Sequence, residues 1–206
     1  MSERIPTYIH ASAAKAAAAM LFVAEELPAR WDALYRETAL FRRLPVDRLI
    51  IALYMADRYS LVRYERPVYG ETWNAAWHGI EPQIAIDILR NHLSIHRRIP
   101  GHTDRTIHMT ASADVVKEGT CDRSLLSDSD VESLLAGMDA MIKMDRPEIE
   151  RFHLSDKGWL GGRARGVINP VYMISVDDNS AQELKDDCNL LWVRRVIPKT
   201  AETTVF

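Results

Sequence analysis

The stretch that decides the fold is "LYMADRYSLVRYERPVYGETWNAAWHGIEP", residues 53–82. Its first half continues an apolar run that starts near Leu49, and a run that is apolar on almost every side is typical of a buried helix. Its second half turns at residues 67–70 and then alternates between two sides, as a half-buried strand does. We therefore expect a central helix followed by a strand. One side of that strand carries Trp73, Ala75 and Trp77.

The rest of the chain is predicted to be mainly helical, because most of its apolar residues recur at helical spacing. An alanine-rich helix is expected to end at Pro28, and a later helix to start at a cap near Ser127 or Ser129. The predicted helices cover residues 10–27, 31–41, 45–59, 82–96, 125–142, 147–155 and 184–195, and a hairpin pairs residues 105–110 with 113–119. The predicted fold is a compact helical domain with one or two small β-hairpins.

Composition narrows the classes of function. The 206 residues are 47% hydrophobic and 27% charged, and the formal net charge is −3. This balance suits a globular domain and argues against a protein that coats nucleic acid, because such proteins carry a basic excess. No apolar run is long enough to cross a bilayer, and we expect no signal peptide. The two separate cysteines, Cys121 and Cys188, favour a reduced, cytoplasmic protein.

No constellation of residues predicts catalysis, a cofactor or a metal. The histidines His92, His96 and His102 have the ligand spacing of a zinc-protease motif, but Leu93 stands where the general-base glutamate belongs. A metal-dependent hydrolase is therefore the weakest hypothesis. The glycine-rich segment at residues 157–166 is expected to be a flexible loop rather than a phosphate-binding loop. The acidic residues of the helix start are explained by capping; these are Asp128, Asp130 and Glu132.

Several short motifs in order along the chain resemble the Panacea domain family, which includes the SocA-like antitoxins and was formerly a domain of unknown function. They are "LYMADRY", "RPVYGETWNAAWHGIEP", "LLSDSDVESLL" and "IERFHLSDKGWL". The positions that match the family pattern are Leu53, Tyr54, Ala56, Arg66, Pro67, Gly70, Glu71, His78, Gly79, Leu126, Ser127, Asp130, His153 and Trp159.

This resemblance extends over roughly residues 10–165, and the chain departs from it in places. Ile80 and Glu81 separate His78-Gly79 from the proline that usually follows directly, and Phe152 replaces a small hydroxyl residue before the late histidine. We expect an antitoxin domain at residues 1–165. The C-terminal extension at residues 166–206 either packs on that domain or forms a tail.

The resemblance implies an antitoxin that binds and neutralises a protein toxin encoded beside it. Some family members also pass their toxin to a Clp-type protease, so a proteolysis adaptor is the alternative. Tyrosine, tryptophan and arginine dominate protein-binding hot spots, and the aromatic stretch is rich in them. The candidate partner-binding or family-signature residues are Tyr54, Arg66, Pro67, Gly70, Glu71, Trp73, Trp77, His78, Gly79, His153 and Trp159. Any of them can instead be a buried determinant of the fold. The toxin's identity and the oligomeric state stay open.

Overall fold

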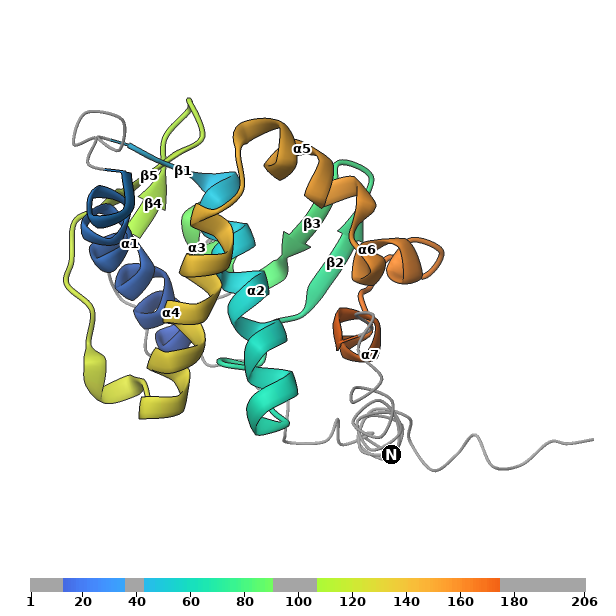
Figure 1. Cartoon of the computed structure of the whole chain (residues 1–206), viewed down its shortest axis with the longest axis horizontal. Helices are drawn as coiled ribbons and strands as arrows, with labels where there is room; N and C mark the ends of the chain where they lie inside the picture. Colours follow the sequence, from blue (N-terminus) through green and yellow to red (C-terminus); the bar gives the residue numbers. More distant parts are fainter. Residues whose placement is uncertain (1–12, 36–42, 91–106, 175–206) are drawn as a thin grey trace, which may run out of the picture.

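In the computed structural model we describe residues 13–35, 43–90 and 107–174. Three helices lie side by side and form the main layer: α1 (Ala13–Tyr35), α4 (Asp128–Ile142) and α2 (Val46–Tyr64) (Figure 1). The two small antiparallel sheets flank this layer. The prediction of a mainly α domain with small hairpins is therefore confirmed.

Helix α2 is the centre of the domain, as its apolar sequence predicted. Leu49, Ile51 and Leu53 are fully buried, and so is the large side chain of Tyr54. Helix α4 packs against α2 at Gly137, where a Cβ atom would lie 2.2 Å from the carbonyl oxygen of Ala52. Only glycine lets the two backbones approach this closely, so the pairing of the helices depends on that residue.

The prediction that the first helix ends at Pro28 is wrong. Helix α1 runs through the proline to Tyr35 and absorbs the start of the short helix predicted at residues 31–41. Leu27, before the proline, is fully buried, and Trp31, after it, packs against the same core. Burial of apolar side chains on both sides of the proline outweighs the loss of its one hydrogen bond. The predicted residues 36–41 lie outside the described ranges.

The predicted hairpin of residues 105–110 and 113–119 is confirmed as β4 (Ile107–Met109) and β5 (Asp114–Lys117). A two-residue strand, β1 (Leu44–Pro45), adds to it in the order β1-β5-β4 and had not been predicted. The second sheet is the hairpin of β2 (Trp73–Ala76) and β3 (Gly79–Pro82), with Trp73 paired to Pro82. Its first strand was predicted and its second was not.

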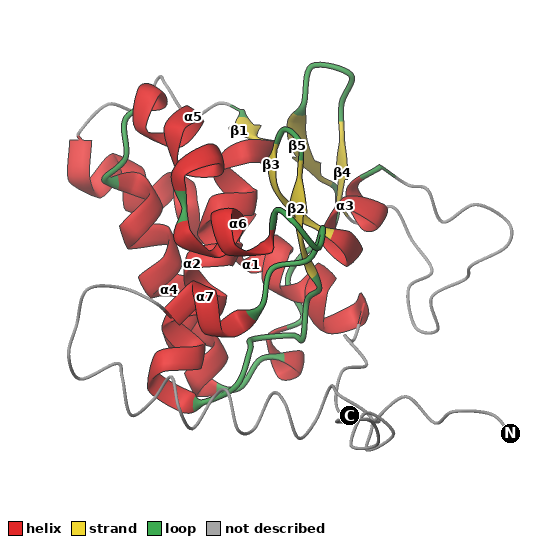
Figure 2. Cartoon of the chain, turned by 90° about the vertical axis from the view of Figure 1, so that its right-hand side faces the viewer, coloured by secondary structure: helices red, strands yellow, loops and turns green. Residues whose placement is uncertain are grey.

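Three short helices contact the β2–β3 hairpin: α3 (Gln83–Leu89), α5 (Arg146–Ser155) and α6 (Lys157–Gly162). The last helix, α7 (Pro170–Ile174), packs on α6 and α2, and a 3₁₀ turn at Arg123–Leu125 contacts α1. Figure 2 shows α5, α6 and α7 on the side of the molecule that carries the hairpin, where α5 contacts β3 and α6 contacts β2. None of the helices in the described ranges has both the length and the apolar character that a bilayer crossing requires.

Helix starts follow the capping chemistry of the sequence. Ser127 caps α4 and forms a reciprocal capping box with Asp130, and Asp145 does the same for α5 with Glu148. The residues just after the predicted domain end at 165 pack on the domain: Ile168 is buried and donates its N–H to the carbonyl of Trp73 at 2.8 Å. The helix predicted at residues 184–195 lies outside the described ranges.

Candidate functional site

The β2–β3 hairpin is fixed to the central helix by a buried carboxylate. Asp57 of α2 is 1% exposed. It accepts a hydrogen bond from the indole Nε1 of Trp73 at 2.7 Å and another from the backbone N–H of Val68 at 2.8 Å. Burial raises the pKa of Asp57 to about 6, and these two donors act in the opposite direction. Trp73 is thus a buried anchor of the hairpin, which leaves its ring unavailable for stacking on a base.

A second buried carboxylate positions the helix after the hairpin. Glu71 accepts hydrogen bonds from the backbone N–H groups of Thr72, Ile84 and Ala85 at 2.8 to 3.0 Å. Two of these donors lie in the first turn of α3, where N–H groups have no partner within the helix. Burial raises the pKa of Glu71 to about 7 against the effect of the three donors. Glu71 therefore serves the fold as a helix cap.

A third buried carboxylate joins α2 to the helices that cover the hairpin. Asp156 accepts from the hydroxyl of Tyr54 at 2.6 Å, from Nη1 of Arg58 at 3.0 Å and from the N–H of Gly158 at 2.7 Å. Burial, followed by the nearby charge of Asp156, raises the pKa of the Tyr54 hydroxyl. The indole Nε1 of Trp159 donates to the carbonyl of Ala76 at 2.9 Å. Strand β2 is thereby held to α6.

Arg66 and Asp130 connect α1, α2 and α4 just beyond the C-terminal end of α2. Nη1 of Arg66 lies 2.8 Å from Oδ1 of Asp130, and Nζ of Lys15 lies 2.7 Å from Oδ2. Nη2 of Arg66 also donates to the hydroxyl of Ser129 at 2.6 Å. Although burial acts to raise the pKa of Asp130, the hydrogen bonds from Lys15, Ser127 and Arg66 lower it overall. Asp130 caps α4, as predicted, and also pairs with Lys15 and Arg66.

The two glycines of the motif stand where the backbone requires them. Gly70 has a φ of 77° in the turn after Pro67, and Gly79 has a φ of 133° at the start of β3. A Cβ atom on Gly79 would lie 2.7 Å from Cβ of His153, so the hairpin turn rests directly on α5. Burial lowers the pKa of His153 and favours its neutral form. His153 is therefore a packing partner of the turn.

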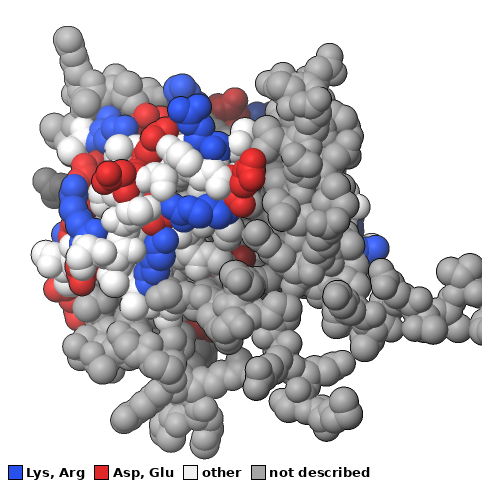
Figure 3. Space-filling view, turned by 90° about the horizontal axis from the view of Figure 1, so that it is seen from below, with Lys and Arg blue, Asp and Glu red and all other residues white. Residues whose placement is uncertain are grey.

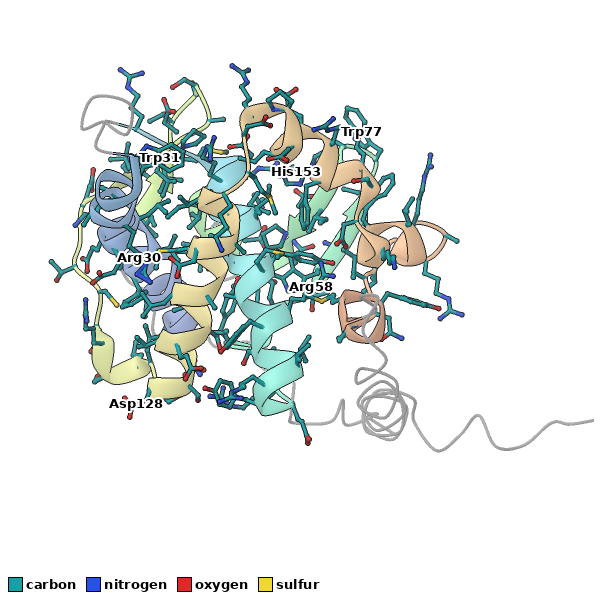
Figure 4. The ribbon with its side chains drawn as sticks, in the orientation of Figure 1. Arg30, Trp31, Arg58, Trp77, Asp128 and His153 are labelled. Carbon is teal, nitrogen blue, oxygen red and sulfur yellow. The ribbon has the colours of Figure 1, made fainter. Side chains whose placement is uncertain are left out.

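Trp77 differs from every other aromatic residue of the motif, because it is 90% exposed. The prediction that it shares a side of the strand with Trp73 is wrong: β2 ends at Ala76, and Trp77 and His78 form the turn between the strands. The two rings meet edge to face with centroids 5.2 Å apart. Figure 4 shows Trp77 at the tip of the hairpin, beyond the layer of helices.

Other exposed apolar side chains come from the helices that hold this tip. Leu154 follows His153 on α5 and is 48% exposed, and Leu160 follows Trp159 on α6 and is 54% exposed. The guanidinium of Arg163 lies over the ring of Trp159, 5.2 Å from its centroid. Leu154 lines a pocket between α4 and α5, together with residues such as Ala140 and Phe152. We call the remaining residues the hairpin-tip surface: Trp77, His78, Leu160 and Arg163. Exposed clusters of aromatic, aliphatic and arginine side chains are typical of protein-binding sites.

The structure separates the predicted residues into two groups. Trp77 and His78 lie on the hairpin-tip surface, while the other nine are buried or half-buried, hydrogen-bonded, or part of the turn at residues 67–70. Reasoning from the sequence missed the two acids that organise these residues, Asp57 and Asp156. Both leave a signal: Asp57 directly follows the apolar run of residues 49–56, and Asp156 stands at the cap position of "DKGWLGG". The exposure of Leu154 and Leu160 has no comparable signal.

The structure gives no support to a metal site or a phosphate-binding loop within the residues that it describes. His92, His96 and His102 lie outside the described residues, and within those ranges no three His, Cys, Asp or Glu side chains are grouped to hold a metal. The loop predicted at residues 157–166 is wrong for its first part, since α6 is helical and Gly162 packs against the backbone of Ile168. On the described part of the face in Figure 3, basic and acidic side chains are interspersed.

Comparisons of the chain with protein-family models, with curated proteins and with solved structures found no match. The resemblance to the Panacea domain family therefore stays a prediction that rests on the short motifs alone.

Proposed function

We propose that this protein is a cytoplasmic antitoxin that neutralises a protein toxin by direct contact, with the hairpin-tip surface as its binding site. The single observation that carries the site is the 90% exposure of Trp77. An exposed tryptophan leaves a large apolar surface in water, and burial against a partner recovers that free energy. The assignment to the antitoxin class rests on the ordered motifs of the sequence.

The rigid mounting of the hairpin supports a role in binding. Trp73 and Trp159 hold β2 from two directions through hydrogen bonds of 2.7 and 2.9 Å. A preorganised contact loses little conformational entropy when a partner binds. The tip therefore presents Trp77 in a defined place.

The hydrogen bonds of the buried acidic side chains favour a binding protein over an enzyme. Asp57, Glu71 and Asp156 each accept hydrogen bonds from groups that hold the fold together. A general acid or base needs a proton path to a substrate, and these carboxylates face the protein interior. Burial explains the raised pKa values of Asp57 and Glu71, and their structural hydrogen bonds act in the opposite direction. We therefore propose that the protein makes and breaks no covalent bond.

The adaptor alternative is less well supported. An adaptor needs a flexible hinge, for which the glycine-rich segment at residues 157–166 is the candidate, and a C-terminal tail that engages the protease. The first part of the expected hinge is helix α6, and the tail lies outside the described residues. We keep direct neutralisation as the proposed function.

Co-expression with the neighbouring gene tests the proposal. We expect that gene to stop growth when expressed alone and growth to return when the wild-type protein is present. Trp77→Ala should weaken the rescue, whereas Leu125→Ala, which removes a 40% exposed apolar residue elsewhere, should leave it intact. A neighbouring gene that is harmless alone, or whose toxicity persists beside the wild-type protein, contradicts the proposal.

A further inference from the structure

The surroundings of the hairpin tip carry a local excess of positive charge although the whole chain is acidic. The segment at residues 151–167 contains four arginines and lysines and a single carboxylate, Asp156. That carboxylate is buried and pairs with Arg58. Arg151, Arg163 and Arg165 are all exposed. The charge that this segment presents to solvent is therefore positive.

Two acidic side chains at the tip and on α5, Glu81 and Glu150, have cationic neighbours, whereas Glu148 accepts a hydrogen bond from the backbone N–H of Asp145. Glu81 lies 3.5 Å from Arg90 and 4.0 Å from His78. Glu150 lies 3.1 Å from Arg146. Among residues 13–35, 43–90 and 107–174, no carboxylate lies within 4.0 Å of the guanidinium nitrogens of Arg151, Arg163 or Arg165. Within the described part of the chain, the three guanidinium groups therefore have no carboxylate partner.

Apolar and cationic groups are combined in one place. Arg163 stacks on Trp159, whose indole donates to the carbonyl of Ala76, directly before Trp77. Leu160 lies between Trp159 and Arg163 in the sequence and is 54% exposed. Arginine in such a stacked position keeps its guanidinium edge free to form paired hydrogen bonds with a carboxylate.

From this charge complementarity we propose that the hairpin-tip surface binds an acidic segment of a partner protein in which aliphatic or aromatic residues alternate with Asp or Glu. Apolar residues of that segment cover Trp77 and Leu160, and its carboxylates pair with Arg163 and Arg165. The inference rests on the proposed function for the statement that the partner is a protein, and it adds the chemistry of the contact segment.

The observations favour a peptide over a nucleic acid. Bases stack on aromatic rings, but aliphatic side chains offer them neither stacking nor hydrogen bonds. Leu160, which is 54% exposed, adds an aliphatic side chain to the aromatic Trp77 of this surface.

Selection from a displayed library of random short peptides tests the inference on the full chain. We expect the selected peptides to be enriched in Asp, Glu and apolar residues. Fluorescence anisotropy with one such peptide should show binding that weakens with added salt. Trp77→Ala and the double change Arg163→Glu with Arg165→Glu should each reduce affinity by more than tenfold. Arg43→Glu, at a 76% exposed arginine next to β1, should leave it unchanged.

Three outcomes overturn the inference: basic or neutral peptides are selected, no peptide is selected, or the selected peptide binds both variants as tightly as the wild type. An oligothymidine that binds the tip in place of the peptides overturns it in favour of a nucleic acid. Rescue from the toxin that survives both arginine changes sinks this inference and leaves the proposed function standing. Binding of acidic peptides by a protein that does not neutralise the toxin contradicts the proposed function and leaves this inference standing.

Discussion

Removal of one hydroxyl group, in Tyr54→Phe, tests whether the buried connection between α2 and α6 holds the domain together. The hydroxyl donates to Asp156 at 2.6 Å in the protein interior. A hydrogen bond to a charged group contributes about 1.5 to 3 kcal/mol. Asp156 keeps the N–H of Gly158 and the guanidinium of Arg58, so it is not left without partners. We therefore expect a loss of about 2 kcal/mol in the free energy of unfolding.

Tyr59→Phe provides a matched control on the same helix. The Tyr59 hydroxyl also donates to a carboxylate, that of Glu132 at 2.7 Å, but this hydrogen bond is exposed to solvent. Exposed polar interactions contribute little, so we expect a change below about 0.5 kcal/mol. Urea unfolding measures both: a loss of about 2 kcal/mol lowers the midpoint by about 1 M when the slope is about 2 kcal/mol per M. Equal midpoints for the two variants would refute the structural role assigned to the Tyr54–Asp156 pair.

Three other changes probe the packing and the buried acids. Gly137→Ala places a methyl group 2.2 Å from the carbonyl oxygen of Ala52, and we expect it to destabilise the domain by about 3 kcal/mol or more, measured by urea unfolding. Gly79→Ala meets both a φ of 133° and the side chain of His153; we expect a loss of about 2 kcal/mol or more, with the amides of the hairpin losing protection from hydrogen exchange first. The raised pKa of Glu71 means that the folded state holds its proton more tightly than the unfolded chain does, so this group lowers stability as pH rises from its ordinary value of 4.5 to about 7. In Glu71→Gln that contribution is absent, and a plot of unfolding free energy against pH should fall less steeply in this window, by up to about 1.4 kcal/mol per pH unit; parallel plots for the two proteins contradict the assignment.

Local sequence patterns predicted the elements that local physics controls. The capping pattern at Ser127 or Ser129 predicted the start of α4, and the alternation after the turn at residues 67–70 predicted β2. The position of Pro28 gave the wrong end for α1, because the packing of Leu27 and Trp31 outweighs the cost of one proline. β1 was not predicted, since a strand of two residues carries no pattern of its own and exists only through its pairing with β5.

The candidate site could be predicted in part. The aromatic stretch at residues 53–82 predicted the correct region, but its period-two alternation placed Trp77 on the same side of the strand as Trp73. The strand ends at Ala76, so one residue of difference moves Trp77 from the side of the sheet to the turn. Which aromatic residues reach solvent depends on contacts with α5 and α6, about 80 residues further along the chain. Such long-range contacts leave no local signal in a single sequence.

The affinity of the purified protein for the product of the neighbouring gene, measured by calorimetry with wild type and Trp77→Ala side by side, tests the central claim most directly. Tryptophan at a binding hot spot contributes about 2 kcal/mol or more, so the variant should bind at least ~30-fold more weakly while its free energy of unfolding stays at the wild-type value. No detectable binding of the wild-type protein, or equal affinities for the two proteins, would contradict the assignment of the hairpin tip as the binding site.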